Sequence, residues 1–296
     1  MRLISLAAFI SEFQDASEKR PYHFVAALLT TLVLTLLVIP WILTLLNIND
    51  YLPALIGEIL ATASAVFFMN WLGWWERLGY TARIHKHDLL DISVPFIFIS
   101  LPALLGLLIV VATGTLRVPP SDLLYFALQA LMLGFIEETF FRGFILQAFL
   151  SQGLIRAVLF SAVLFTISHL ASIFNGSDLL YVFAQILLSI GWGCSFAVLW
   201  IRSRALWPLI AMHCLRDFCS LTIQENQGAA FTNQTYGWAI LSSICISMLL
   251  LFYSFWLLRP IRLQQMRDRY SAAKQSPPST SLPTNSPEHH TSLRRP

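Results

Sequence analysis

Residues 92–113 read ISVPFIFISLPALLGLLIVVAT and contain no charged side chain. The hydrocarbon core of a bilayer is about 30 Å thick, and a helix needs about 20 apolar residues to cross it. Inside hydrocarbon the backbone must satisfy its own hydrogen bonds, so a run of this length predicts a transmembrane α-helix. The whole chain has the same character, because 56% of its residues are hydrophobic and only 12% are charged. The sequence therefore indicates an α-helical membrane protein.

Similar apolar runs lie on both sides of this stretch. Together they give candidate spans at approximately 24–46, 51–75, 92–113, 121–150, 154–174, 179–201, 205–222 and 236–258. The fourth is long, so we expect it to tilt, to kink or to begin in the membrane interface. No repeat period and no soluble block interrupts the series. We predict an all-α, polytopic transmembrane bundle of about eight spans that forms one domain, residues 24–258.

The basic residues in the connections predict the orientation of the bundle, because Lys and Arg are retained on the cytoplasmic side. They occur before the first span, in the 76–91 connection and after the last span, whereas three of the four connections on the opposite side contain neither residue. Both termini are therefore expected in the cytoplasm. Residues 1–23 form an N-terminal segment that could include an interfacial helix. Residues 259–296 are expected to form a basic juxtamembrane segment and a disordered tail rich in Ser, Pro and Thr.

Composition also limits the partners and the location. The formal net charge is +3, and the basic residues are dispersed between spans, so we expect no nucleic-acid partner. The lipid bilayer is the expected surroundings, and the chain reads as an integral, multi-pass protein of a bacterial-type inner or cell membrane. The oligomeric state is left open.

Ionisable side chains inside the spans are the candidates for function, because charge in the hydrocarbon region is costly. The fourth span contains GFIEETFFRG at residues 134–143. Glu138 and Arg142 are four residues apart on one face of a helix, where they can form an ion pair. Glu137 points about 100° away from that face. It would be free to act as a base in a cavity.

Two further spans contribute polar groups. The fifth contains FTISH, in which Phe165 and His169 share a helix face, and the seventh contains HCLRD, in which His213 and Asp217 are four residues apart. At a helical rise of about 1.5 Å per residue, these groups and the carboxylates of the fourth span lie on the order of 12–20 Å below the cytoplasmic surface. One shared intramembrane pocket is therefore geometrically possible.

Each of these groups also has a purely structural interpretation. A histidine or carboxylate in a membrane is often only an interhelical hydrogen-bond partner. Glu138 with Arg142 could be an ion-pair clamp, and His213 with Asp217 could be a buried, satisfied pair. Glu58 in the second span belongs to no motif, and we expect it to be structural. The occurrence of three polar groups on three spans at similar depth favours a single site.

These three segments, in this order, resemble the CPBP family of CAAX-protease and bacteriocin-processing intramembrane proteases, also called the ABI family. The family pattern is Glu-Glu-x-x-x-Arg, then Phe-x-x-x-His, then His-x-x-x-Asn or Asp, and the resemblance covers about residues 121–222. It implies a CAAX-type intramembrane endopeptidase, a hydrolase whose substrate is a membrane-associated protein or peptide. The matching residues are Glu137, Glu138, Arg142, Phe165, His169, His213 and Asp217.

Carried over residue by residue, the resemblance assigns roles to these side chains. Glu137 and His169 would activate the attacking water, and His213 and Asp217 would lie where the family stabilises the oxyanion. The supporting residues would be Glu138, Arg142 and Phe165. Amide hydrolysis needs a base for water, donors for the tetrahedral oxygen and an acid for the leaving amine, so the residue types suit the reaction.

Asp217 departs from the asparagine that can occupy the last position. An asparagine amide can donate to an oxyanion, whereas an ionised aspartate only accepts hydrogen bonds. Asp217 would therefore be protonated, or orient His213, or help to hold a cation.

Metal dependence is left open by the sequence. Glu137, His169 and His213 could ligate zinc or another divalent metal with one position free. The chain lacks the His-Glu-x-x-His pair typical of zinc proteases. We therefore favour a metal-free mechanism.

Two other classes of function fit the same residues. A proton-coupled transporter would use the carboxylates and histidines as a relay, although the chain shows no paired Gly/Pro-broken spans in corresponding halves. A non-catalytic scaffold or immunity protein would retain the motif for stability. The leading interpretation is an intramembrane protease, and the sequence does not distinguish a prenylated protein from a leader peptide or an anchor segment as its substrate.

Overall fold

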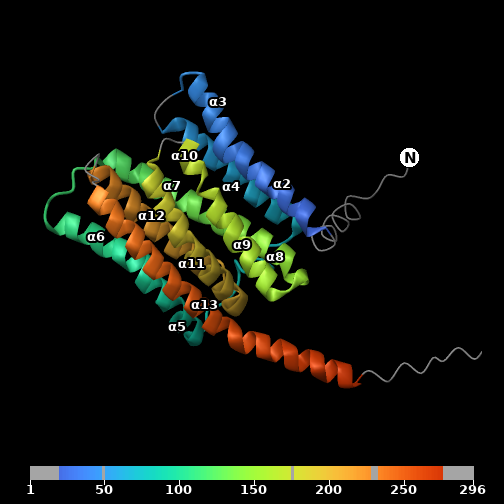
Figure 1. The fold of residues 1–296 in the computed structure, drawn as a ribbon. Coiled ribbons are helices and arrows are strands. Elements are labelled where there is room, and N and C mark those ends of the chain that lie inside the picture. Colours follow the sequence, from blue (N-terminus) through green and yellow to red (C-terminus); the bar gives the residue numbers. More distant parts are fainter. Residues whose placement is uncertain (1–19, 49–50, 175–176, 228–232, 276–296) are drawn as a thin grey trace, which may run out of the picture. The chain divides into compact units, whose positions relative to one another are not determined.

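The computed structural model describes residues 20–48, 51–174, 177–227 and 233–275 of the 296-residue chain. Every regular element in these ranges is a helix (Figure 1), which confirms the all-α prediction. The chain divides into two compact units, Met1–Trp256 and Leu257–Pro296.

The elements follow one another along the chain in a simple order. They are α2 Pro21–Val33, the π-helix η1 Leu34–Val38, α3 Ile39–Leu45, α4 Leu52–Leu72, α5 Lys86–Pro95, the π-helix η2 Phe96–Ser100, α6 Leu101–Ala112, α7 Pro120–Glu137, the π-helix η3 Glu138–Ile145, α8 Leu146–Phe149, the 3₁₀ helix η4 Leu150–Gln152, α9 Leu154–Ser168, α10 Ala171–Phe174, α11 Leu179–Ser203, α12 Trp207–Gln227 and α13 Asn233–Gln275.

Seven helices in the described residues are long and apolar enough to cross a membrane. They are Pro21–Leu45, Leu52–Leu72, Lys86–Ala112, Pro120–Gln152, Leu154–Phe174, Leu179–Ser203 and Gly237–Ile261. These correspond to seven of the predicted spans, so the chain is an integral, multi-pass membrane protein. The remaining predicted span, 205–222, is α12. This helix is long enough to cross a membrane, but His213, Arg216 and Asp217 make it less apolar than the other seven.

The two ends of the chain lie largely outside the described residues. The predicted interfacial helix within 1–23 falls almost entirely on residues 1–19, and the predicted tail is described only as far as Gln275. The segment that follows the last predicted span is helical as far as Gln275. It belongs to α13, which contains Pro260 within the helix. The cytoplasmic location of both termini stays a prediction.

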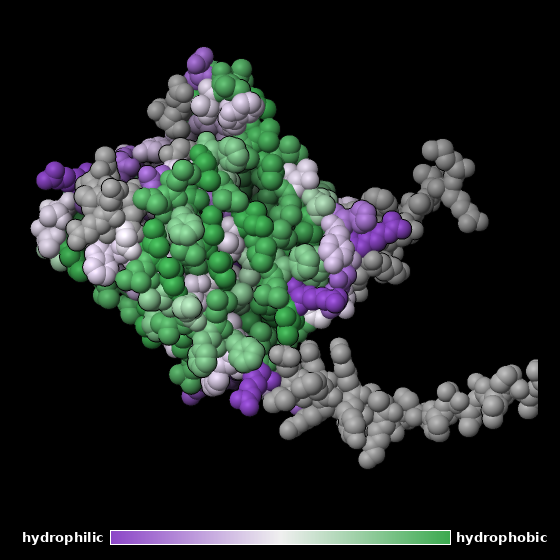
Figure 2. All heavy atoms as spheres, in the orientation of Figure 1, coloured by the Kyte–Doolittle hydropathy of each residue, from purple (hydrophilic) through white to green (hydrophobic). Residues whose placement is uncertain are grey.

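The flank of the first unit is apolar. Large hydrophobic side chains such as Phe67, Phe174, Met248 and Phe252 are more than half exposed. Figure 2 shows hydrophobic residues over most of the visible flank, with hydrophilic residues at its margins. Soluble monomers rarely expose apolar patches of this extent, so this surface is suited to lipid.

Close packing between α7 and α12 fixes the centre of the first unit. α12 also packs against α6, while α9 packs against α11 and α4 against α7. At Gly134 an added Cβ would lie only 2.6 Å from Cys214 Sγ and 3.2 Å from the backbone nitrogen of Cys214. Only a residue without a side chain allows the two helices to approach this closely. The polar residues of α7 and α12 are therefore brought to one level.

The long fourth span changes its winding in the middle, at the acidic motif. α7 ends at Glu137, and η3 begins at Glu138 as a π-helix that is wholly buried. Such π-helical turns inside α-helices occur frequently at functional sites. The length of this span predicted a tilt, a kink or a start in the interface, and the structure shows in addition a change of helix type at the two carboxylates.

Candidate active site

Glu138 lies at the centre of a buried ion-pair arrangement. Its Oε1 accepts a hydrogen bond from Arg142 Nη1 at 3.0 Å, and both side chains are fully buried. The same oxygen lies 2.7 Å from Nδ1 of His213. The predicted pairing of Glu138 with Arg142 is therefore present, and His213 on α12 joins it.

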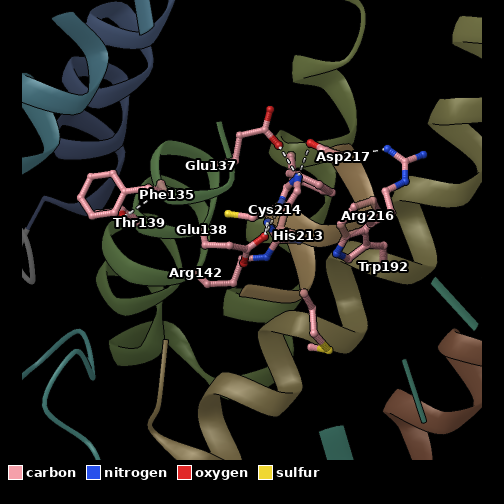
Figure 3. A network of polar contacts seen from close by, with 12 residues as sticks. Phe135, Glu137, Glu138, Thr139, Arg142, Trp192, His213, Cys214, Arg216 and Asp217 are labelled. Atoms are coloured by element: carbon pink, nitrogen blue, oxygen red, sulfur yellow. Dashed lines mark hydrogen bonds and ion pairs between the residues drawn. The ribbon is translucent and has the colours of Figure 1, made fainter. Parts of the chain in front are cut away.

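The other ring nitrogen of His213 faces two more carboxylates. Nε2 lies 3.4 Å from Oε2 of Glu137 and 3.3 Å from Oδ2 of Asp217. The sequence predicted that Glu137 points away from the Glu138 face, and the two carboxylates do occupy different sides, but the imidazole lies between them (Figure 3). Regular α-helical spacing could not predict this, because η3 begins at Glu138 and because His213 comes from another helix.

The charges of this cluster balance when His213 is protonated. Carboxylate oxygens only accept hydrogen bonds, and both imidazole nitrogens face them, so a doubly protonated ring satisfies both sides. Burial of charges is tolerated where they are paired in this way. The members described are the carboxylates of Glu137, Glu138 and Asp217, the guanidiniums of Arg142 and Arg216, and the imidazole of His213.

His169 joins the site through Phe165. The Phe165 ring is fully buried and packs edge-on against His169 at 4.8 Å and against His213 at 6.2 Å between centroids. Arg142 lies over the same ring at 3.9 Å. Among the described residues no hydrogen bond or ion pair joins His169 to Glu137, so the predicted catalytic pair is not in direct contact.

The position of the His169 proton follows from its partner. Nδ1 of His169 lies 3.0 Å from the backbone oxygen of Phe165. A carbonyl oxygen only accepts, so Nδ1 carries the hydrogen and the neutral ring keeps its lone pair on Nε2. This nitrogen is in the form that accepts a proton.

Arg216 and Trp192 are two members of the site that the sequence motifs did not include. Nη1 of Arg216 donates to Oδ1 of Asp217 at 2.8 Å, and the guanidinium lies over the Trp192 ring at 5.2 Å. The same ring packs against His213 at 4.6 Å. Arg216 is thus paired with Asp217, its neighbour in the chain. Trp192 lies on α11 and belongs to none of the three motifs. Its contact with His213 depends on how α11 packs, which spacing within one helix does not predict.

Tyr80 reaches the acidic motif from the connection between α4 and α5. Its hydroxyl lies 2.5 Å from Thr139 Oγ1, and Thr139 donates to the Phe135 carbonyl at 2.5 Å. Tyr80 is therefore the donor to Thr139. Burial raises the pKa of the Tyr80 phenol, which keeps this donor protonated. The connection thereby holds the junction between α7 and η3, a contact that helical spacing does not predict.

The donor set does not fit a resident metal ion in this arrangement. Within the described residues, no three His, Cys, Asp or Glu side chains are grouped as a metal site. Both nitrogens of His213 already face carboxylates, so neither directs a free lone pair outward.

Glu58 lies outside the motif residues. It is buried on α4 and accepts a hydrogen bond from Gln129 of α7 at 3.1 Å. The contact joins two helices and agrees with the structural interpretation made from the sequence.

Comparison with protein families gives an independent result. Residues 119–219 match the family described as type II CAAX prenyl endopeptidase, Rce1-like. This stretch includes all seven motif residues, from Glu137 to Asp217. Searches of curated proteins and of solved structures gave no match. The family match confirms the resemblance to the CAAX proteases: residues 119–219 are similar to the Rce1-like family of type II CAAX prenyl endopeptidases, which are peptide hydrolases.

Proposed function

We propose that this chain hydrolyses a peptide bond of a membrane-associated protein or peptide with water activated by Glu137 and His169. The observation that carries the proposal is the difference between the two adjacent carboxylates. The Glu138 side chain is fully buried in its contacts with Arg142 and His213, whereas the Glu137 side chain is 22% exposed. Of these two adjacent carboxylates, Glu137 is the one that water and substrate can reach.

His169 supplies a second proton acceptor. Its Nδ1 is held by the Phe165 carbonyl, so its Nε2 lone pair is free to orient or deprotonate a water molecule. In the proposed mechanism, one water molecule is bound by both His169 and Glu137.

His213 is suited to stabilising the oxyanion. Its Nε2 lies 3.4 Å from Oε2 of Glu137 and 3.3 Å from Oδ2 of Asp217 in the resting site, so a hydrogen on Nε2 faces both carboxylates. Once Glu137 accepts the proton of water, it no longer attracts this N–H as an anion. The N–H then becomes available to the tetrahedral oxygen, and a preorganised donor in a water-poor site is effective there. Asp217 would orient His213 rather than donate to the oxyanion.

The proposed reaction conserves its atoms. The water oxygen bonds to the scissile carbonyl carbon while its proton moves to Glu137, and the carbonyl oxygen becomes the oxyanion. The carbon–nitrogen bond then breaks, and Glu137 returns the proton to the leaving nitrogen. The products are one carboxylic acid and one amine. Glu138 with Arg142 would hold His213 in place throughout this sequence.

Comparative proteomics of membrane peptides tests the proposal. Cells that produce the wild-type chain are compared with cells that produce Glu137→Gln at equal abundance, and Glu76→Gln serves as a control because Glu76 is an exposed carboxylate in a connection. We expect one precursor to accumulate uncut with Glu137→Gln alone. The absence of any such precursor, or its accumulation in the control as well, contradicts the proposal. Loss of a solute uptake with unchanged peptides would point to a transporter instead.

A further inference from the structure

A second polar contact lies among the membrane-spanning helices, between α4 and α7. Glu58 is only 3% exposed, and one of its carboxyl oxygens accepts a hydrogen bond from Gln129 at 3.1 Å. Among the described residues its other oxygen, which is also buried, has no hydrogen-bond partner. A carboxyl group buried in a membrane without a cation is stable only when it carries a proton or contacts water. The contact with Gln129 therefore accounts for only one of the two oxygens.

Thr62 presents another buried polar atom on the same face of α4. It lies four residues after Glu58, and side chains with this spacing share a helix face. Helical threonines can donate their hydroxyl to the carbonyl four residues earlier, as Thr30 and Thr31 do on α2. The hydroxyl oxygen of Thr62 is buried and has no such partner within the described ranges. Both groups on this face therefore suit a small polar ligand such as water, which typically binds where buried polar atoms lack a protein partner.

α4 and α7 run in the same direction where they meet. The ring of Tyr51, which precedes α4, stacks on Tyr125 at 4.1 Å between centroids. Further along both helices, Glu58 contacts Gln129. The two contacts advance together along both helices, as they do in a parallel pair. Since Tyr51 is 42% exposed, a line of polar side chains extends from the surface into the bundle.

The same line leads towards Glu137 at its inner end. Thr62 is four residues beyond Glu58 on α4, and Glu137 is eight residues beyond Gln129 on α7. At a rise of about 1.5 Å per residue, Thr62 lies about midway in depth, roughly 6 Å from the level of either carboxyl group. Two hydrogen bonds of about 2.8–3.0 Å span such a gap, so a water molecule can bridge each half. Glu58 and Glu137 also lie within electrostatic reach of each other.

The proposed hydrolysis leaves one proton to be moved. After the carbon–nitrogen bond breaks, the new carboxylic acid of the product faces the ionised Glu137, and the two carboxyl groups share one proton. The peptide then covers the exposed side of Glu137, so the proton needs a route through the protein. Once this proton has left, the product and Glu137 are both anions, and their repulsion favours release of the product.

We propose that Glu58 and Thr62 hold water on the inner side of Glu137 and that Glu58 relays the proton of the product towards the surface at Tyr51. The product acid passes its proton to Glu137, and Glu137 passes it through water to Glu58. Glu58 gives up its own proton towards Tyr51 at the same time, so each O–H bond that breaks is replaced by another and no charge accumulates. This inference rests on the proposed function, because it needs Glu137 as the base. Glu58 touches no reacting atom and is a positioning residue for the proton.

The test separates the first turnover from the later ones. The purified full chain in liposomes cleaves a farnesylated CAAX peptide, and product is measured with the peptide in excess over the enzyme. Glu58→Gln keeps the hydrogen bond from Gln129 through its amide oxygen but has no acid proton to exchange. The first turnover should therefore stay within about twofold of the wild-type rate, and later turnovers should slow by roughly tenfold or more. The expected progress curve is a burst followed by a slow phase.

Thr62 provides a matched pair of variants. Thr62→Val removes the hydroxyl with little change of shape and should also give a burst, whereas Thr62→Ser keeps the hydroxyl and should not. Glu58→Asp retains the acid and should restore part of the rate of later turnovers. Ser64→Ala is the control on the same helix, because the Ser64 hydroxyl already donates to the Leu60 carbonyl at 2.8 Å. This variant should behave like wild type.

The outcomes separate the relay from a purely structural contact and from the proposed function. If Glu58→Gln slows the first and later turnovers equally, or slows neither, the relay is overturned and the proposed hydrolysis stands. If wild type does not cleave the peptide at all, both proposals fail together. Should Glu58→Gln not fold, Thr62→Val decides, since later turnovers at the wild-type rate would overturn the relay.

Discussion

Replacing Arg142 by methionine would remove the buried cation that Glu138 binds while keeping an elongated side chain. Breaking a buried ion pair in this way costs about 3–5 kcal/mol, because the remaining charge is left unpaired. Here Nη1 and Oε1 are 3.0 Å apart, and both side chains are fully buried. The guanidinium also lies 3.9 Å above the Phe165 ring, and a desolvated contact of this kind contributes about 2 kcal/mol. His213 still contacts Glu138 at 2.7 Å, which limits the loss of stability. We therefore expect Arg142→Met to lower the free energy of unfolding by about 4 kcal/mol.

A second substitution separates the uncompensated charge from the lost packing. Glu138→Gln in the Arg142→Met chain removes the unpaired carboxylate, and the glutamine oxygen can still accept from Nδ1 of His213. Since replacing both partners of a buried pair is often close to neutral, the double variant should recover about 2 kcal/mol relative to Arg142→Met. The two effects should therefore be strongly non-additive, as expected for residues in contact.

Reversible unfolding in mixed detergent micelles measures these differences. Arg83→Met, at an exposed position in a connection, controls for the loss of an arginine and should change the free energy of unfolding by less than about 0.5 kcal/mol. A free energy of unfolding of Arg142→Met within about 1 kcal/mol of the wild-type value would contradict the stabilising role of the buried ion pair. A double variant that is no more stable than Arg142→Met would contradict this role as well.

Three further predictions concern the geometry of the site and its chemistry. Gly134→Ala places a Cβ 2.6 Å from Cys214 Sγ, so it should shift α12 and lower kcat roughly 10- to 100-fold. Cys214→Ala in the same chain should restore most of the activity. A double variant as inactive as Gly134→Ala would contradict the close approach of α7 and α12 at this point. Tyr80→Phe removes the donor to Thr139 and should cost about 1 kcal/mol of stability. It should also lower kcat several-fold at constant KM. An unchanged kcat would contradict a role of Tyr80 in positioning the acidic motif. Treatment of the purified protein with a zinc chelator should leave activity within about twofold, whereas a loss reversed by added zinc would contradict the metal-free mechanism.

The apolar runs predicted most of the fold because a membrane requires long helices with satisfied backbones. The exception is α12, which the sequence assigned as a span but which is not apolar enough to be recognised by hydropathy. Its polar residues, among them His213, Arg216 and Asp217, are the ones that form the site. The polar residues that a span contributes to a site can therefore lower its mean hydropathy below that of an ordinary transmembrane helix.

The site was predictable where it depended on spacing within one helix. The i to i+4 separation correctly predicted the contact of Glu138 with Arg142 and that of His213 with Asp217. Contacts between helices could not be predicted in this way. Trp192 packs against His213 from α11, and no periodicity within a single helix contains that information.

The change from α7 to η3 limited the prediction at the acidic motif itself. Spacing rules assume a regular α-helix, and η3 begins at Glu138. They correctly separated Glu137 from Glu138 but gave no reason for His213 to lie between them. Nor did they include Tyr80, which contacts the motif from a connection far away in the sequence.

The most direct test of the central claim is single-turnover hydrolysis of a prenylated peptide by the purified chain in liposomes. The peptide ends in a farnesylated cysteine, two aliphatic residues and methionine, the C-terminal pattern of prenylated proteins. General-base catalysis contributes typically 10²- to 10⁴-fold, so Glu137→Gln should lower the cleavage rate by at least about 100-fold with peptide affinity unchanged. His169→Gln should also slow cleavage strongly, while Glu76→Gln should cleave at the wild-type rate. Cleavage by folded Glu137→Gln within about tenfold of wild type would contradict the assignment of Glu137 as the base that activates water.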